Sequence, residues 1–245
     1  IETMMLLTIN HQTLIATKAN RICRAAEPAV IMEFGARRAQ GADAAIEGAR
    51  AAYIGGVGAT ATVIADQMFG VTAVGTMAHS WVQFFPTEFE AFKAYAEVYP
   101  DSCTLLIDTY DILESGLVNA IRTAKEVLEP MGKRLKGVRI DSGDLAYFSK
   151  KLRKRLDEAG LEDCQIVVSN SVDEYLINSL KIQDAKIDSY GVGERLITSK
   201  SDPVFGGVYK LVAVKRPDGG FEPKIKISEN PEKVTNPGKK TLWRI

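Results

Sequence analysis

One stretch near the middle of the chain shows the pattern that decides the fold: Val138-Arg139-Ile140-Asp141-Ser142-Gly143-Asp144. Its first three residues are typical of a short buried strand, and polar residues follow where that strand ends. A helical pattern comes next, because apolar residues recur at Leu145, Phe148, Leu152 and Leu156 before Gly160 closes the segment. A strand, a polar turn and an amphipathic helix together make one β/α unit.

The same unit recurs along most of the chain. Strands are expected at residues 30–33, 72–75, 104–107, 138–140, 165–168 and 187–190. Helical patterns cover residues 1–25, 43–53, 60–69, 117–128 and 145–159, and capping boxes at Thr87-x-x-Glu90 and Ser171-x-x-Glu174 open two more. Strands alternating with helices predict a parallel α/β sheet, most simply an irregular or incomplete (β/α) barrel. An open doubly wound sheet is the alternative.

Three segments are expected along the chain. Residues 1–25 form a helical lead-in from a missing N-terminal domain, because the chain starts with Ile1 rather than Met, and residues 26–200 form the barrel. After about residue 201 the β/α pattern stops. Runs of alternating residues flank the turn sequence Pro217-Asp218-Gly219-Gly220, which predicts an antiparallel hairpin. We expect this hairpin, residues 201–245, to be part of a truncated, β-rich second domain.

Composition narrows the class of protein. The 245 residues carry 31 Lys and Arg against 31 Asp and Glu, so no net charge favours nucleic acid or a membrane surface as partner. Hydrophobic residues make up 46%, enough for a sizeable core, yet no apolar run reaches the length of a membrane span. Three widely spaced cysteines are expected to be reduced. We therefore expect a cytoplasmic protein with neither nucleic acid nor membrane as partner.

Polar, charged or glycine residues follow all six expected strands. In a (β/α) barrel the carboxyl ends of the strands form the active site, so these side chains are expected to converge. Arginines suit carboxylates and phosphates, and glycines let backbone N–H groups approach a phosphate. The candidates are Phe34, Arg37, Arg38, Thr76, His79, Asp108, Arg139, Asp141, Ser142, Ser169, Asn170, Gly191 and Gly193. They predict a site for a phosphorylated, anionic small molecule.

Several of these groups also have a structural interpretation. Arg37 and Arg38 could be a solvated pair, although cations at a helix start oppose its dipole and an anion would remove that conflict. Asp108 and Asp111 could cap turns or helices, and Asp144 is expected to do so. We interpret His11 as structural and the basic run at residues 150–155 as a solvated helix face. No His or Cys spacing predicts a metal site.

The strand-end segments resemble nicotinate phosphoribosyltransferase, within the type II phosphoribosyltransferases. They occur in family order and cover nearly the whole chain: Glu33-Phe34-Gly35-Ala36-Arg37-Arg38, Gly75-Thr76-Met77-Ala78-His79-Ser80, Asp108-Thr109-Tyr110-Asp111, Val138-Arg139-Ile140-Asp141-Ser142-Gly143-Asp144 and Tyr190-Gly191-Val192-Gly193. The resemblance implies an irregular α/β barrel that joins nicotinate to phosphoribosyl pyrophosphate in NAD biosynthesis, coupled to ATP hydrolysis. It also implies Mg²⁺ bound through the pyrophosphate or ATP, and a homodimer with a shared active site.

The resemblance assigns roles by position. Phe34 is expected to stack on the pyridine ring, and Arg37 and Arg139 to line the carboxylate and phosphoribosyl site. Asp141 is expected to hold the ribose hydroxyls, and Gly191 and Gly193 to bind the 5′-phosphate. His79 matches the histidine that ATP phosphorylates.

The chain departs from the family pattern at Ala59, Ala61, Ser171 and Glu194, and we expect this 245-residue piece to be inactive alone. Two alternatives stay open: the related nicotinamide or quinolinate enzyme, and a non-catalytic fragment that binds a ligand or a subunit.

Overall fold

The computed structural model describes residues 1–243 and divides them between two compact units. The larger unit comprises residues 11–204. The smaller comprises residues 1–10 together with the C-terminal segment from Phe205 onward.

The larger unit is built on one sheet of six parallel strands, with the order β2-β1-β6-β5-β4-β3. Consecutive strands are neighbours except for β2 and β3, and β1 also pairs with β6. This is the order of a barrel that is open between β2 and β3, and it confirms the incomplete (β/α) barrel over the doubly wound sheet. The strands are β1 (Val30–Glu33), β2 (Ala59–Thr60), β3 (Thr104–Leu106), β4 (Gly137–Ile140), β5 (Gln165–Val168) and β6 (Ser189–Val192).

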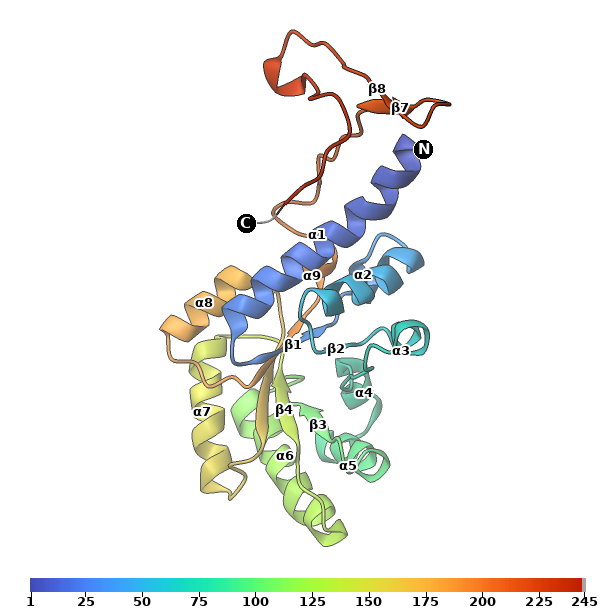
Figure 1. The fold of residues 1–245 in the computed structure, drawn as a ribbon. Helices are drawn as coiled ribbons and strands as arrows, with labels where there is room; N and C mark the ends of the chain where they lie inside the picture. The colour runs from blue at the N-terminus through green and yellow to red at the C-terminus, as the bar shows by residue number, and fades with distance from the viewer. Residues whose placement is uncertain (244–245) are drawn as a thin grey trace. The chain divides into compact units, whose positions relative to one another are not determined.

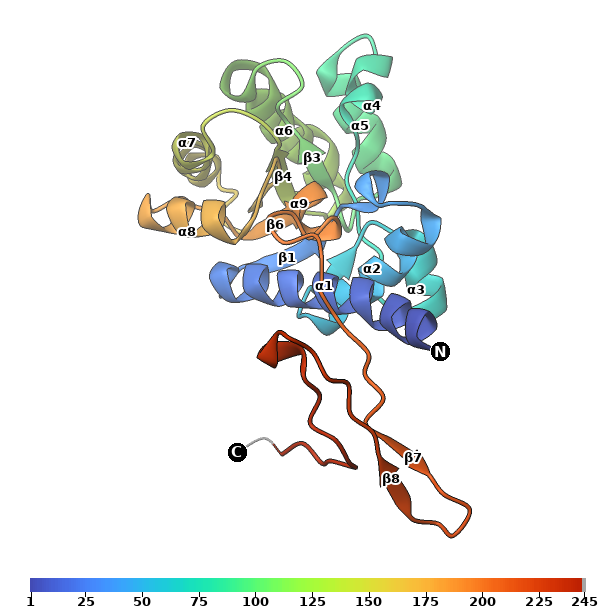
Figure 2. The same ribbon diagram turned by 90° about the horizontal axis from the view of Figure 1, so that it is seen from above.

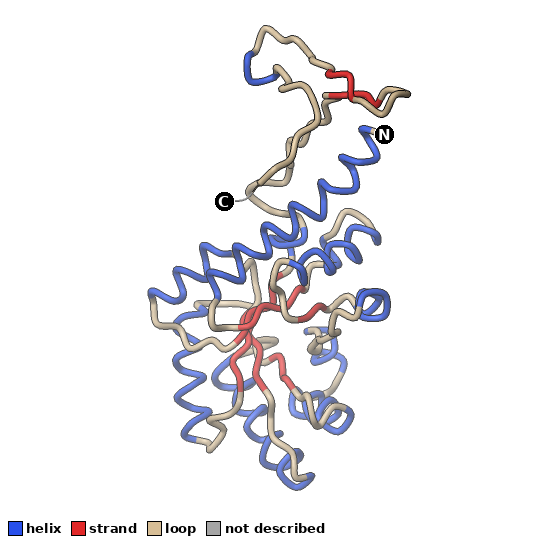
Figure 3. Tube along the Cα trace, in the orientation of Figure 1, coloured by secondary structure: helices blue, strands red, loops and turns tan. Residues whose placement is uncertain are grey.

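Helices surround the strands, which occupy the centre of the unit (Figures 2 and 3). The helices are α1 (Glu2–Ala26), α2 (Ala42–Ile54), α3 (Val63–Phe69), α4 (His79–Phe84), α5 (Glu88–Val98), α6 (Leu117–Thr123), α7 (Leu145–Glu158), α8 (Glu174–Ile182) and α9 (Glu194–Ile197) (Figure 1). The single-turn 3₁₀ segments are η1 (Ala36–Arg38), η4 (Glu129–Met131) and η5 (Pro231–Lys233), and the π-helical segments η2 (Ile112–Gly116) and η3 (Ala124–Leu128) flank α6. No helix among the described residues is long and apolar enough to cross a membrane.

Side-chain caps fix where several helices start, and so fix the turns before them. Thr87 accepts a hydrogen bond from the Glu90 amide at 3.2 Å, as its capping box predicts. Asp144 accepts from the Tyr147 amide at 3.0 Å and opens α7, and Asp111 accepts from two amides at the start of η2. Asp144 and Asp111 therefore have structural roles, because their carboxylates cap the helical segments that follow them.

The structure corrects four boundaries in the larger unit. The helix expected from residue 60 starts at Val63, because Ala59–Thr60 pairs with β1 as a strand. The strand expected at residues 72–75 is a single bridge between Thr60 and Ala73. Asp173, not Ser171, caps α8, accepting from the amides of Tyr175 and Leu176. The last strand runs two residues further than expected, which places Gly191 inside β6.

The hairpin in the smaller unit is shorter than the sequence pattern predicts. Among its residues that the structure describes, only β7 (Ala213–Lys215) and β8 (Phe221–Pro223) pair, in antiparallel register. Pro223 has no backbone N–H to donate, which helps to end the ladder there. The alternating residues 208–211 and 225–227 lie outside both strands.

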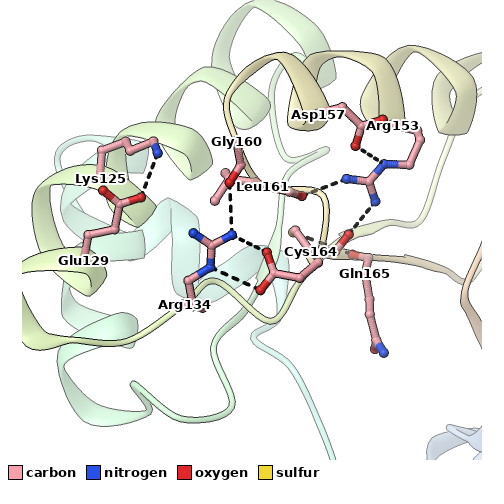
Figure 4. A network of polar contacts seen from close by, with 10 residues as sticks. Lys125, Glu129, Arg134, Arg153, Asp157, Gly160, Leu161, Cys164 and Gln165 are labelled. Atoms are coloured by element: carbon pink, nitrogen blue, oxygen red, sulfur yellow. Dashed lines mark hydrogen bonds and ion pairs between the residues drawn. The ribbon is translucent and has the colours of Figure 1, made fainter.

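The basic run on α7 is only partly a solvated face. Its lysines are exposed, but Arg153 donates hydrogen bonds of 2.7 Å to the carbonyl oxygens of both Leu161 and Cys164 (Figure 4). Arg155 donates to the Leu113 carbonyl at 2.7 Å. Both arginines therefore bind backbone carbonyl groups of segments that lie beside α7. The prediction of a solvated helix face holds for the lysines alone.

Candidate active site

A cleft of about 420 Å³ opens at the carboxyl ends of the strands. Turns after β1, β4, β5 and β6 contribute to its walls, together with residues 75–79. All the candidate residues line it except Asp108 and Ser142. Its lining is Phe34, Arg37, Arg38, Ala61, Gly75, Thr76, Met77, Ala78, His79, Leu106, Arg139, Asp141, Ser169, Asn170, Ser171, Gly191, Gly193 and Glu194. The prediction that strand-end residues converge is confirmed.

Arg139 is the centre of the polar network in this cleft. Its Nη1 donates to Thr76 Oγ1 at 2.7 Å and its Nε donates to Ser169 Oγ at 2.9 Å. Ser169 Oγ donates in turn to Asp141 Oδ1 at 2.7 Å. Burial lowers the pKa of Arg139, Asp141 and Asp108 act to raise it, and Arg37 acts to lower it. Two carboxylates therefore balance a buried guanidinium that faces the cleft.

His79 is the first residue of α4 and its two ring nitrogens have different surroundings. Nδ1 lies 3.1 Å from Thr109 Oγ1, within hydrogen-bond distance. Nε2 lies 3.8 Å from Asp108 Oδ1 and 3.9 Å from Asp141 Oδ2. The side chain keeps 42% of its surface exposed. The ring is therefore held on one side and open on the other, between two carboxylates.

Asp108 and Ser142 do not line the cleft, and Ser142 is exposed. The Asp108 side chain is only 1% exposed, and its Oδ2 accepts hydrogen bonds from the Asp141 amide at 2.8 Å and from Ser142 Oγ at 2.6 Å. Its Oδ1 is buried and has no hydrogen-bond partner among the described residues. Asp108 therefore supports the turn that carries Asp141, and Ser142 contacts Asp108 rather than the cleft.

The position of Phe34 depends on Gly191 in β6 and on Gly193 just after it. A Cβ added to Gly191 would lie 2.5 Å from the Phe34 ring, so only glycine leaves room for the ring there. A Cβ on Gly193 would lie 3.1 Å from the Phe34 carbonyl oxygen. The Arg139 guanidinium carbon lies 5.4 Å from the centre of the same ring. An aromatic face and a cation therefore stand side by side in the cleft.

Strained backbone follows β5. Asn170 and Ser171 have φ values of 87° and 51°, in the left-handed region that non-glycine residues seldom adopt. Such residues cluster at binding sites, where the surrounding structure holds them. Glu194 also lines the cleft, and its Oε1 lies 3.0 Å from Lys200 Nζ. Glu194 is therefore a paired carboxylate beside the cleft.

Two residues that position the site were missed as candidates. Glu33 is fully buried; its Oε1 accepts from the Gly35 amide and its Oε2 from Thr60 Oγ1 at 2.6 Å. Burial raises the pKa of Glu33, and these hydrogen bonds act to lower it. Thr109, the contact of His79, lies in the segment that carries Asp108. Both residues belong to segments that the sequence had marked, so their neighbours were the available signal.

Two further findings concern metals and the second histidine. Among residues 1–243, no group of three His, Cys, Asp or Glu side chains is arranged to hold a metal ion. His11 lies outside the cleft on α1, where burial lowers its pKa and nearby Glu47 acts to raise it. Its Nε2 is buried and has no partner in the described part of the chain, in line with a structural role.

Comparison with known proteins gives one consistent result. Residues 29–239 match the nicotinate phosphoribosyltransferase (NAPRTase) family. The chain is 53% identical to a Bacillus subtilis nicotinate phosphoribosyltransferase, over all of this chain and 49% of that protein. It is 33% identical to the Homo sapiens protein of that name, over all of this chain and 54% of the other. The chain thus spans about half the length of the curated relatives it matches.

Solved structures agree with the sequence comparison. Human nicotinic acid phosphoribosyltransferase superposes with a TM-score of 0.72 at 30% identity, over 78% of this chain and 49% of that one. A nicotinate-nucleotide pyrophosphorylase from Pyrococcus furiosus superposes with a TM-score of 0.70 at 28% identity, over 98% and 62%. The family match covers most of the chain and includes every strand of the larger sheet. The chain therefore belongs to the nicotinate phosphoribosyltransferase family.

Proposed function

We propose that the whole protein joins nicotinate to phosphoribosyl pyrophosphate, forming nicotinate mononucleotide and pyrophosphate in NAD biosynthesis. The observation that carries this proposal is the network of Arg139, Ser169 and Asp141 in one cleft with His79. It offers a cation for a carboxylate or phosphate and a carboxylate for ribose hydroxyls. The names of the relatives, nicotinate phosphoribosyltransferases from bacteria to human, support the same reaction.

The nicotinate subsite is assigned to Phe34, Arg139 and Arg37. The Phe34 ring is half-buried in the wall of the cleft and gives a flat apolar surface for a pyridine ring. Arg139 and the exposed Arg37 line the same cleft and supply the cations that a pyridine carboxylate requires. A neutral amide in place of that carboxylate would leave these arginines without a counter-charge, which favours nicotinate over nicotinamide.

The phosphoribosyl subsite is assigned to the turns after β4, β5 and β6. Asp141 is expected to accept hydrogen bonds from the ribose hydroxyls, and the backbone of Gly191 and Gly193 to approach the 5′-phosphate, with Ser169 and Asn170 beside them. In the reaction the bond from ribose C1 to pyrophosphate breaks and the pyridine nitrogen bonds to C1. Positive charge develops on the sugar meanwhile, and the Asp141 carboxylate is placed to stabilise it.

His79 is assigned to the coupling with ATP. Its Nε2 faces the carboxylates of Asp108 and Asp141, and its exposed edge leaves access for a phosphate donor. Mg²⁺ bound to pyrophosphate or ATP would neutralise phosphate charge. An ion that arrives on its substrate keeps most of its other ligands as water. Asp108 Oδ1, which has no hydrogen-bond partner among the described residues, and the Asp141 carboxylate are oxygen donors of the type that Mg²⁺ prefers. We also propose a homodimer with a shared active site.

The test uses the full-length protein with labelled nicotinate, phosphoribosyl pyrophosphate and Mg²⁺, with and without ATP. We expect nicotinate mononucleotide in both reactions and faster formation with ATP. Nicotinamide and quinolinate, offered in parallel, are expected to give little product. Preferential use of either would replace the proposed substrate, and no product from any of the three would favour a non-catalytic binding protein.

A further inference from the structure

The part of the cleft assigned to the phosphoribosyl group is lined by two turns that follow the neighbouring strands β5 and β6. Asn170 and Ser171 follow β5, and Gly193 and Glu194 follow β6. The strands pair in parallel, with Val168 opposite Tyr190, so the two turns leave the sheet side by side. The first turn is strained at both Asn170 and Ser171. Such a conformation persists only where surrounding contacts hold it in place.

A single buried carboxylate connects the segments that follow these turns. Asp173 is 4% exposed, and its Oδ1 accepts hydrogen bonds from the amides of Tyr175 at 3.1 Å and Leu176 at 2.8 Å, which cap α8. Its Oδ2 accepts a hydrogen bond from Nη1 of Arg195. Arg195 is the second residue of α9 and follows Glu194 directly. Asp173 therefore lies at the end of the turn after β5 and, through Arg195, contacts the segment that follows the turn after β6.

A buried ion pair lies next to Asp173, at the adjacent residue Glu174. Lys18 on α1 lies 2.7 Å and 2.9 Å from the two oxygens of Glu174, and the two side chains are 4% and 10% exposed. Glu174 is the neighbour of Asp173, so two adjacent acids are balanced by one base from α1 and one from α9. Buried charges of this kind depend on their partners, because an unpaired one is strongly disfavoured. The arrangement leaves the start of α8 little freedom to shift.

We propose that the Asp173–Arg195 ion pair is a positioning device that fixes the turn after β5 against the turn after β6, and thereby sets the affinity for the phosphoribosyl donor. The link to the donor rests on the function proposed above. Neither Asp173 nor Arg195 lines the cleft, so the pair acts through the backbone of the two turns rather than on the substrate. Without it, Asn170 and Ser171 are free to relax toward ordinary backbone angles.

The test compares Arg195→Gln with Arg195→Lys in the full-length protein. Arg134→Gln is the matched control, because it breaks the exposed Arg134–Asp163 ion pair on the surface. Asp173→Asn is a second variant in which the side-chain oxygen can still cap α8. Amide hydrogen exchange in the substrate-free protein reports on the two turns, residues 169–172 and 193–197. Steady-state kinetics report KM for each substrate separately.

We expect Arg195→Gln and Asp173→Asn to speed exchange in both turns and to raise KM for phosphoribosyl pyrophosphate by about tenfold, equivalent to about 1.4 kcal/mol. KM for nicotinate should stay within about twofold, Arg195→Lys should restore most of the loss, and Arg134→Gln should match the wild type. Unchanged exchange in both turns, or an equal rise in both KM values, would overturn the inference. Wild-type protein that forms no product would instead overturn the proposed function, while exchange still judges the ion pair.

Discussion

The buried carboxylate of Asp108 holds the backbone of Asp141, because its Oδ2 accepts the Asp141 amide hydrogen at 2.8 Å. The two residues follow neighbouring strands, β3 and β4, whose register sets Leu106 opposite Arg139. The hydrogen bond therefore carries the geometry of the sheet into the turn that presents Asp141 to the cleft. Ser142 strengthens the same contact through its hydroxyl, at 2.6 Å.

Asp108→Asn should damage both stability and activity. The amide removes the charge that strengthens two hydrogen bonds, which is expected to lower the free energy of unfolding by roughly 1.5–3 kcal/mol. Denaturant unfolding measures that loss. Asp144→Asn is the matched control in the same turn, because asparagine caps a helix about as well as aspartate. A fully stable Asp108→Asn protein would contradict the role of Asp108 as a support.

His79→Ala should abolish ATP hydrolysis and labelling of the protein by the γ-phosphate of ATP. Some ATP-independent formation of nucleotide should survive, since the ribosyl chemistry is assigned to other residues. His11→Gln is the control, because His11 lies outside the cleft and should leave labelling intact. A His79→Ala protein that still acquires the label would show that the phosphorylated residue is a different one.

Asp141→Asn should impair the use of phosphoribosyl pyrophosphate more than the binding of nicotinate. A carboxylate that holds ribose hydroxyls through charged hydrogen bonds contributes roughly 1.5–3 kcal/mol, so KM for the donor should rise about tenfold or more. The change also weakens the contact with Ser169, now 2.7 Å. Kinetics with each substrate varied in turn make the comparison, and an unchanged KM for the donor would rule this role out.

Elements defined by a repeating pattern could be predicted from sequence, whereas those defined by a contact across the fold could not. α7 is amphipathic and capped by Asp144, so local rules locate it to within a residue. β2 is only two residues long and exists because Thr60 pairs beside Glu33, which no local pattern reports. β6 extends through Gly191, a residue that signals a turn unless the ring of Phe34 is known to pack against it.

The same distinction between local patterns and contacts across the fold applies to the residues of the candidate site. Side chains that line the cleft were identified because barrel strands end at one face, so position in the sequence implies position in the site. Supporting residues such as Glu33 and Thr109 act through side-chain contacts with residues on other strands and turns, which a local sequence pattern does not show. Asp108 was identified as a residue that binds substrate, but its burial makes it a support for Asp141.

Gly191→Ala should weaken the binding of nicotinate and leave the fold in place. The added methyl group would lie 2.5 Å from two carbons of the Phe34 ring, so the ring must move. Overpacking of this kind costs roughly 1–3 kcal/mol, and here the ring is the assigned surface for the pyridine. KM for nicotinate should rise, and Phe34→Ala in the same background should relieve the strain on stability. Gly206→Ala is the control, because Gly206 does not line the cleft and an added methyl there meets no described atom within 4 Å.

Acid should remove the stabilising effect of Asp173 in a defined range of pH. Burial acts to raise the pKa of Asp173, but the Leu176 amide, Arg195 and Lys18 together hold it below its ordinary value of 3.8. The folded chain therefore binds this proton less readily than the unfolded chain does. The contribution is complete well above pH 3.8, begins to shrink as the unfolded chain takes up the proton, and is lost as the pH falls through the folded pKa. Asp173→Asn lacks the titrating group. The difference in unfolding free energy between wild type and this variant should be constant from neutral pH down to about pH 5, roughly one unit above the ordinary value, and should shrink below it.

Guanidinium unfolding of both proteins between pH 7 and pH 3 makes the measurement, with Asp163→Asn on the exposed Arg134 pair as reference. A difference that persists undiminished at pH 3 would mean that Asp173 stabilises the chain without its charge.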